Sequence, residues 1–220
     1  LGRMMMISIV ARVLKPGCKN ELVPIFTGPQ GVGKSTLAQK ICDAICPETF
    51  VHLSSDLSSE ELHYQLSGSI VVEMSELVSM RKSTIETVKS FVSKTEDRFR
   101  PQYARHKKTV TRGFSIIGTG NNSEFLVDDE NRRFYPLEIQ HRYDFAALEK
   151  ALPYLLAEAV HLFDKGEPWH STDPLFLAQH KAACESAQDR DVFSDRILSV
   201  AHSFHEPFKT QEVIFRMLDR

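Results

Sequence analysis

Short apolar runs alternate with longer amphipathic segments along the first two thirds of the chain. Short runs bounded by Gly, Pro or polar residues are typical of buried strands, whereas apolar residues spaced three or four apart over ten or more positions predict helices. We expect strands at 22–28, 49–53, 69–74, 113–120 and 131–139, and helices at 3–14, 34–45, 82–94 and 144–165. Ser58 and Glu61 form a capping box, which predicts a further helix start.

The pattern changes near residue 141, after which it is helical throughout. Helices are expected at 144–165, 174–188, 191–203 and 209–219. Alternating strands and helices favour a three-layer α/β sheet. We therefore expect an α/β core at residues 1–140 and a C-terminal helical subdomain at 141–220.

The composition narrows the classes of protein to consider. A chain of 220 residues, 42% hydrophobic and 25% charged, fits one large globular domain, or one domain with a small appendage. The net charge of -2 gives no global reason to expect nucleic acid or a membrane surface, so local patches must carry any such claim.

The cysteines, the apolar runs and the first residues of the sequence bear on the cellular compartment and on whether the chain is a fragment. The four cysteines lack zinc-site spacing, which favours a reducing, cytoplasmic compartment. No apolar run approaches the roughly 20 residues of a membrane span, so no membrane partner is expected. The sequence opens with Leu1 and enters a helical pattern directly, which suggests a fragment of a longer polypeptide.

The stretch GPQGVGKST matches the phosphate-loop pattern G-x-x-x-x-G-K-[ST], between an apolar strand and a helix. Glycines let successive N–H groups surround phosphate oxygens, Lys34 reaches the β- and γ-phosphates, and Ser35 ligates Mg²⁺. ATP and Mg²⁺ are therefore the expected cofactors. The predicted nucleotide-binding residues are Gly28, Pro29, Gln30, Gly31, Val32, Gly33, Lys34, Ser35 and Thr36.

Two glutamates lie around the end of the strand expected at 69–74: Glu73 within it, and Glu76 just after it. Glu73 lies where a phosphate loop needs an acid for Mg²⁺, so Ser35 and Glu73 form the predicted metal site. If the chain turns helical after Glu73, Glu76 shares its face and becomes a candidate base for the attacking water. The alternative is that Glu76 is a solvated turn residue.

Polar residues also end the next apolar strand, FSIIGTGNN. The amide of Asn121 there is suited to bridging a γ-phosphate and a water molecule without ionising. Adjacent asparagines after a strand are also typical of an ordinary turn.

A basic stretch at 94–112 interleaves cations with Phe99 and Tyr103. A basic loop or hairpin with aromatic residues is suited to tracking a phosphate backbone and stacking bases. The alternative is a solvated charged face.

Further on, NRRFYP places Arg132 and Arg133 before a strand. Either arginine is a candidate to stabilise a transferring phosphoryl group, while one of the pair could instead hold a carboxylate.

With these motifs in order, the chain resembles the virulence-associated protein E family, ATPases of phages, prophages and pathogenicity islands related to superfamily III and AAA+ helicases. The resemblance is carried by ISIVARVLKPGCK, VPIFTGPQGVGKST, IVVEMSEL, KSFVSKTEDRFRPQYAR, GTGN and NRRFYPLEI, within about residues 7–140. Several linked motifs are more specific than a phosphate loop alone.

The resemblance implies an ASCE, AAA+-like P-loop NTPase core. It implies that Glu73 is the Walker B acid, that Glu76 acts as catalytic glutamate, and that Asn121 is the sensor. Arg132 or Arg133 would be the arginine finger, in a ring expected to be a hexamer. The spacing E-x-x-E departs from the adjacent acids of related helicases. A hairpin within 94–112 would contact DNA through Arg98, Arg100, Arg105, Lys107 and Lys108.

The leading interpretation is an ATP-hydrolysing, DNA-binding replication helicase or translocase of a phage or mobile genetic element, acting on single-stranded DNA. A P-loop small-molecule kinase is an alternative, although no feature names an acceptor. A nucleotide-gated interaction module without unwinding is another, because binding without turnover needs only the loop.

Overall fold

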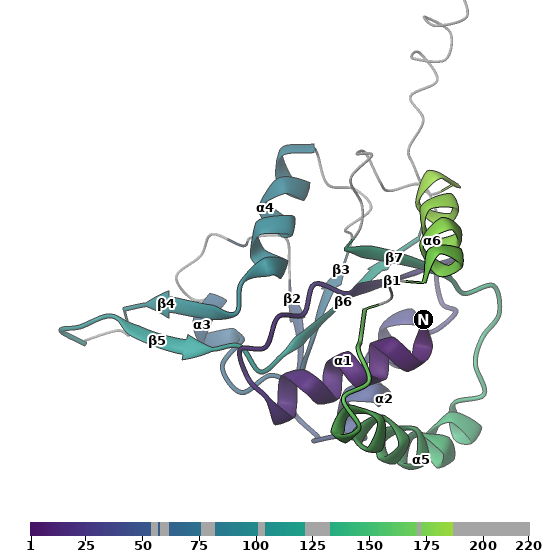
Figure 1. Ribbon diagram of the computed structural model, residues 1–220, viewed down its shortest axis with the longest axis horizontal. Helices are drawn as coiled ribbons and strands as arrows, with labels where there is room; N and C mark the ends of the chain where they lie inside the picture. The colour runs from purple at the N-terminus through teal and green to yellow at the C-terminus, as the bar shows by residue number, and fades with distance from the viewer. Residues whose placement is uncertain are drawn as a thin grey trace, which may run out of the picture.

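A five-stranded parallel sheet forms the centre of the protein in the computed structural model, which describes residues 1–53, 57, 62–75, 82–100, 104–121, 133–170 and 173–186 (Figure 1). The strands are β1 (Val23–Thr27), β2 (Phe50–Leu53), β3 (Val71–Ser75), β6 (Ser115–Gly120) and β7 (Phe134–Glu138). Their order in the sheet is β2-β3-β6-β1-β7, and every neighbouring pair is parallel. All five carboxyl ends therefore meet at one edge of the sheet.

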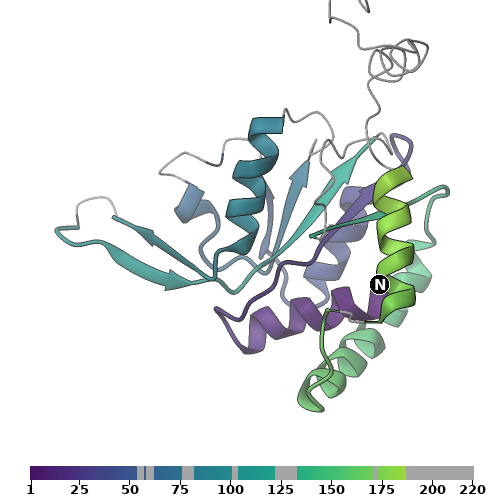
Figure 2. The same ribbon diagram turned by 45° about the horizontal axis from the view of Figure 1, so that its top comes forward.

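Helices cover both faces of this sheet (Figures 1 and 2). On one face lie α1 (Gly2–Leu14), α2 (Lys34–Asp43) and α5 (Phe145–Asp164), and on the other lie α4 (Lys82–Ser93) and α6 (Pro174–Ser186). The short helix α3 (Leu62–Gln65) packs with the α4 side. The expected three-layer α/β architecture is confirmed in these terms: a parallel sheet flanked by helices.

Side chains alternate between the two faces of each strand, so each strand contributes to two hydrophobic cores, one on each face of the sheet. In β3, Val72 and Met74 join the core under α4, whereas Val71 joins the core under α1, α2 and α5. Glu73 has the same parity as Val71 and therefore faces α2. The single charged position of β3 is thus directed at the start of α2.

Most expected elements are present, with small shifts at their ends. The helix expected from Ser58 can be followed only as α3, since residues 58–61 lie outside the described part of the chain. The helices expected at 191–203 and 209–219 also lie outside it.

The described part of the segment expected to form a helical subdomain packs directly on the sheet layers. Helix α5 packs against α1, and α6 packs against β7. Asp144 caps α5 by accepting hydrogen bonds from the amides of Ala146 and Ala147 at 3.0 and 3.1 Å. A subdomain boundary near residue 141 stays a prediction. None of the helices among the described residues is long and apolar enough to cross a membrane.

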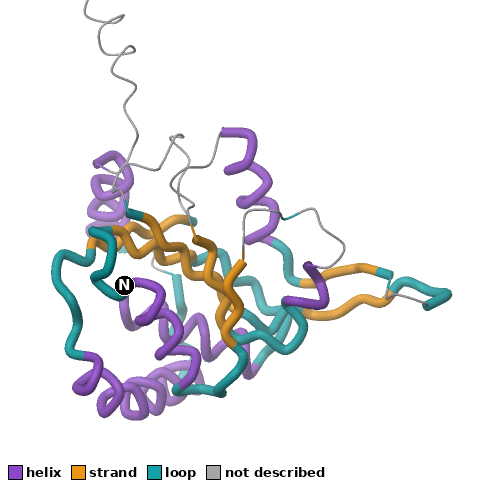
Figure 3. Tube along the Cα trace, turned by 180° about the vertical axis from the view of Figure 1, so that it is seen from behind, coloured by secondary structure: helices purple, strands orange, loops and turns teal. Residues whose placement is uncertain are grey.

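A two-stranded antiparallel hairpin, β4 (Glu96–Phe99) and β5 (Lys108–Thr111), extends sideways from the body (Figures 1 and 3). The basic stretch was expected to form either a loop or a hairpin, and the structure shows the hairpin. The hairpin lies in the chain between α4 and β6, so it joins the strand of Glu73 to the strand that precedes Asn121.

Candidate functional site

The segment 28–33 connects β1 to α2 at the carboxyl edge of the sheet. Gly28, Gly31 and Gly33 have φ angles of 138°, 84° and 96°, a region that side-chain-bearing residues rarely adopt. A Cβ on Gly28 would lie 2.2 Å from the carbonyl oxygen of Ile139, and one on Gly33 would lie 2.5 Å from Cζ of Phe145. The shape of this loop therefore requires glycine.

The side chain of Lys34 folds back into this loop. Its Nζ donates hydrogen bonds to the carbonyl oxygens of Gly28 at 2.8 Å and Pro29 at 2.9 Å, and to Oδ1 of Asn121 at 3.1 Å. Desolvation by burial lowers the pKa of Lys34. The structure thus brings together two predicted residues, Lys34 and Asn121, that are far apart in sequence.

Glu73 is fully buried beside the first turn of α2. Its Oε1 accepts hydrogen bonds from Oγ of Ser35 and from Oγ1 of Thr119, both at 2.6 Å. Its Oε2 lies 3.0 Å from Nδ1 of His52. The two predicted metal ligands, Ser35 and Glu73, are therefore in direct contact.

This donor set fits Mg²⁺. Hydroxyl and carboxylate oxygens are the hard ligands that Mg²⁺ takes from proteins, and the ion usually obtains its other ligands from water and substrate phosphates. Among the described residues, no group of three or more His, Cys, Asp and Glu side chains could hold a metal ion. Ser35 and Glu73 thus suit an ion shared with a phosphate at the loop, rather than an ion enclosed by protein.

Two residues of this cluster, His52 and Thr119, were missed by the sequence analysis. His52 pairs with Glu73 in the β2–β3 register, which requires knowing that these strands are neighbours. Thr119 gave a usable signal, because it is polar within an apolar strand and two residues before Asn121.

The second glutamate, Glu76, lies outside the described residues. Strand β3 continues through Met74 and ends at Ser75, so the chain does not turn helical directly after Glu73. The shared helical face on which the role of Glu76 depended is therefore not formed at 74–75, and that role stays a prediction.

Of the arginine pair, Arg133 lies at the opposite edge of the sheet from the loop. Arg133 immediately precedes β7, which runs parallel to β1, so it lies about 20 Å of strand away from the loop. Its Nε forms an ion pair of 3.1 Å with Oε1 of Glu21. Burial raises the pKa of Glu21, but hydrogen bonds from Ser93, Arg133 and Lys19 outweigh this and lower it overall. Arg133 therefore holds a carboxylate in its own chain, and Arg132 lies outside the described residues.

The five predicted DNA-contacting side chains are exposed on the hairpin and around its tip: Arg98, Arg100, Arg105, Lys107 and Lys108. In the register of the hairpin, Arg98 faces Thr109 and Phe99 faces Lys108. The structure therefore presents a basic, solvent-facing projection.

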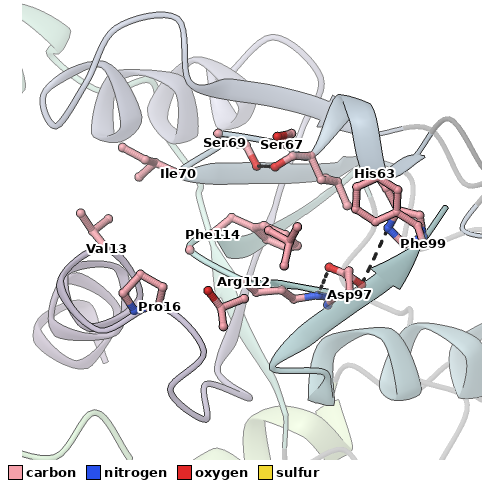
Figure 4. A pocket seen from close by; sticks show the side chains of 15 residues that line it. Val13, Pro16, His63, Ser67, Ser69, Ile70, Asp97, Phe99, Arg112 and Phe114 are labelled. Atoms are coloured by element: carbon pink, nitrogen blue, oxygen red, sulfur yellow. Dashed lines mark hydrogen bonds and ion pairs between the residues drawn. The ribbon is translucent and has the colours of Figure 1, made fainter. Parts of the chain in front are cut away.

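Arg112, also from the basic stretch, is instead buried at the base of the hairpin (Figure 4). Its Nε and one terminal nitrogen donate to the two carboxylate oxygens of Asp97, each at 2.6 Å, and the guanidinium lies 4.1 Å from the ring centroid of Phe91. A cavity of about 330 Å³ lies beside this pair, with His63 stacked on Phe99 in its wall. Arg112 anchors the hairpin to the body.

Together, the fold and the site define a three-layer parallel α/β domain with a glycine-dependent loop at the carboxyl edge of β1 and a basic hairpin beside the sheet. The chain belongs to the virulence-associated protein E-like domain family, whose sequence model matches residues 1–191. The family expected from the motifs is thereby confirmed. No curated protein matches the chain.

Among solved structures, the chain is similar to three apo structures of the NrS-1 C-terminal region. The TM-scores are 0.53, 0.54 and 0.55, at sequence identities of 16%, 17% and 16%. The matches cover 88% of this chain and 49%, 48% and 49% of those chains, so this chain spans about half of their length. At these identities the similarity shows the fold alone.

Proposed function

We propose that this chain is the P-loop, AAA+-like ATPase core of a DNA-binding replication helicase or translocase from a phage or mobile genetic element. The observation that carries the proposal is the 2.6 Å contact between Ser35 and the buried Glu73 at the glycine-dependent loop. A hydroxyl at a helix start facing an acid on another strand of the same sheet is the arrangement that P-loop ATPases use for Mg²⁺.

Each residue of the cluster has a role in this proposal. The loop amides and Lys34 hold the β- and γ-phosphates, and Ser35 and Glu73 hold Mg²⁺. The bound ion would supply neutralisation of charge on the phosphates. Asn121 orients the attacking water, and Thr119 and His52 fix the rotamer of Glu73.

The remaining predicted roles belong to the assembled form. Glu76 is proposed as the base for the attacking water. Because Arg133 lies at the far edge of the sheet, an arginine of the pair Arg132 and Arg133 would act on the nucleotide of a neighbouring subunit, in a ring that we propose to be a hexamer. The exposed hairpin would carry the single-stranded DNA.

ATP hydrolysis with and without single-stranded DNA tests the catalytic part of the proposal. The wild-type chain is expected to hydrolyse ATP in a Mg²⁺-dependent manner, with stimulation by DNA. Glu73→Gln and Lys34→Ala are expected to lower the rate by about a hundredfold or more. Glu158→Gln, an exposed change on α5, serves as the control and should have no effect. Equal rates for Glu73→Gln and the control would refute the assignment.

Charge reversal on the hairpin distinguishes a DNA motor from a kinase. The double variant Lys107→Glu/Lys108→Glu is expected to abolish DNA stimulation while leaving basal hydrolysis unchanged, because neither lysine lies at the loop. Lys150→Glu, on α5, is the matched control. A kinase should be indifferent to all of these changes, and a gated module should bind ATP without turnover in the wild type.

A further inference from the structure

A second cavity, of about 590 Å³, opens at the amino edge of the sheet. Its walls come from the end of α1, the approaches to β1 and β7, and the segment after α5. We call it the amino-edge pocket. Small-molecule sites typically enclose about 300–1,000 Å³. The cavity therefore has the size of a site for a nucleotide-sized molecule.

The charge of the amino-edge pocket is predominantly positive. Its cationic or titratable basic lining residues are Lys15, Lys19, Arg133 and His170. Its acid, Glu21, is already engaged by Arg133 at 3.1 Å and by Lys19 at 3.3 Å. One carboxylate cannot neutralise this set of cations, so the pocket is suited to an anion.

Aromatic side chains lie beside these cations. Trp169 is held in the wall because its Nε1 donates to the carbonyl oxygen of Lys19 at 3.1 Å, and its ring packs on Phe163. Tyr135 is also part of the wall, and its ring is supported by stacking on His180 at 4.1 Å. Fixed aromatic faces next to cations are the combination that binds bases together with their phosphates.

We propose that the amino-edge pocket binds a nucleotide unit, with its phosphate held by Lys15 and Lys19 and its base against Trp169. A free nucleoside monophosphate and a stretch of single-stranded nucleic acid share this chemistry. The pocket lies at the opposite edge of the sheet from the phosphate loop, about 20 Å of strand away, so it is a separate site from the proposed ATP site.

The pocket also connects to the base of the hairpin. The amide of Gly17 donates to the carbonyl oxygen of Arg112 at 2.9 Å, so the segment that carries Lys15 and Lys19 runs along the hairpin base. The pocket is therefore adjacent to the base of the hairpin that we propose to contact DNA.

Intrinsic fluorescence provides a direct test, because Trp169 is the sole tryptophan of the chain. The probes are AMP and an oligothymidylate of about eight nucleotides, titrated into the wild type and into the Lys34→Ala variant. Saturable quenching is expected in both proteins, because stacking on an indole changes its emission and the phosphate loop is not involved. Loss of ATP hydrolysis would therefore leave this result unchanged.

Charge variants show whether the quenching comes from the pocket. Lys15→Glu and Lys19→Gln are each expected to weaken binding by about tenfold, the usual worth of a hydrogen bond to a charged group. Both lysines are exposed, so melting temperatures should match the wild type. Lys150→Glu, on α5, is the control and should bind normally.

Each outcome decides the proposal. Quenching by both probes would show that a nucleotide alone suffices, and quenching by the oligonucleotide only would identify a strand as the source. The proposal is overturned if neither probe quenches Trp169 at about millimolar concentration, or if Lys15→Glu and Lys19→Gln bind as tightly as the control.

Discussion

The ion pair between Arg112 and Asp97 should dominate the stability of the hairpin base. The change Asp97→Ala removes the carboxylate that accepts two hydrogen bonds of 2.6 Å from Arg112. The two side chains are only 2% and 10% exposed. The guanidinium would therefore remain buried without its counter-charge.

The expected loss is about 4 kcal/mol, in the range of about 3–5 kcal/mol for removing one partner of a buried pair. A second buried guanidinium, that of Arg12, places the expected loss of stability in the middle of that range or above it. Burial lowers the pKa of Arg12, the charge of Arg112 lowers it further, and Asp97 acts in the opposite direction. Loss of Asp97 would therefore leave two buried cations near each other.

Urea denaturation measures this loss, and thermal melting should show a decrease of about 10 °C for a chain of this size. The double variant Asp97→Leu/Arg112→Met should recover most of the stability, because apolar residues of similar volume often replace a buried pair without cost. The control is Glu185→Ala, which breaks an exposed pair with Lys181. It should change stability by less than about 0.5 kcal/mol.

A loss below about 1 kcal/mol for Asp97→Ala would refute the reasoning, because it would mean that water reaches Arg112. A double variant no more stable than Asp97→Ala would equally contradict it, since the cost would then come from packing rather than from an unpaired charge.

Three further predictions concern the loop and the cysteines. Gly28→Ala should destabilise the fold by more than about 2 kcal/mol in urea and abolish ATP binding, because its Cβ would lie 2.2 Å from the carbonyl oxygen of Ile139. Desolvation lowers the pKa of Lys34, so this side chain should lose its positive charge at a lower pH than an ordinary lysine, whose pKa is about 10.4. The ATP affinity measured by calorimetry should therefore begin to fall below that pH, and Lys34→Arg should remove this pH dependence. Burial raises the pKa of the Cys184 thiol to about 11, so a thiol reagent at about pH 8 should label exposed Cys46 rapidly and Cys184 only after unfolding; rapid labelling of Cys184 in the folded protein would contradict its burial.

The phosphate loop and Glu73 could be predicted from the sequence because their signals are local. The spacing of Gly28, Gly33, Lys34 and Ser35 is contained in nine consecutive residues, and the strand before Glu73 is apolar throughout. Parallel strands then bring their carboxyl ends together, which is why Asn121 also meets Lys34.

The rest of the cluster depends on which strands are neighbours. His52 contacts Glu73 only because β2 pairs with β3, and nothing in the sequence of either segment indicates this pairing. Arg112 belongs to a run of cations that looks uniformly solvated, yet Asp97 and Phe91 bury it. Its different role results from tertiary contacts and not from its neighbours in sequence.

Strand β6 has a mechanical consequence for the molecule. It begins three residues after Arg112, which anchors the hairpin, and it ends directly before Asn121, which holds Lys34. The hairpin from Arg112 out to Arg105 is about 23 Å long if extended, so a 10° rotation at its base would move its outer end by about 4 Å. One continuous strand therefore links the residue that contacts Lys34 to the anchor of the basic hairpin, so a shift of β6 along its axis would displace both together.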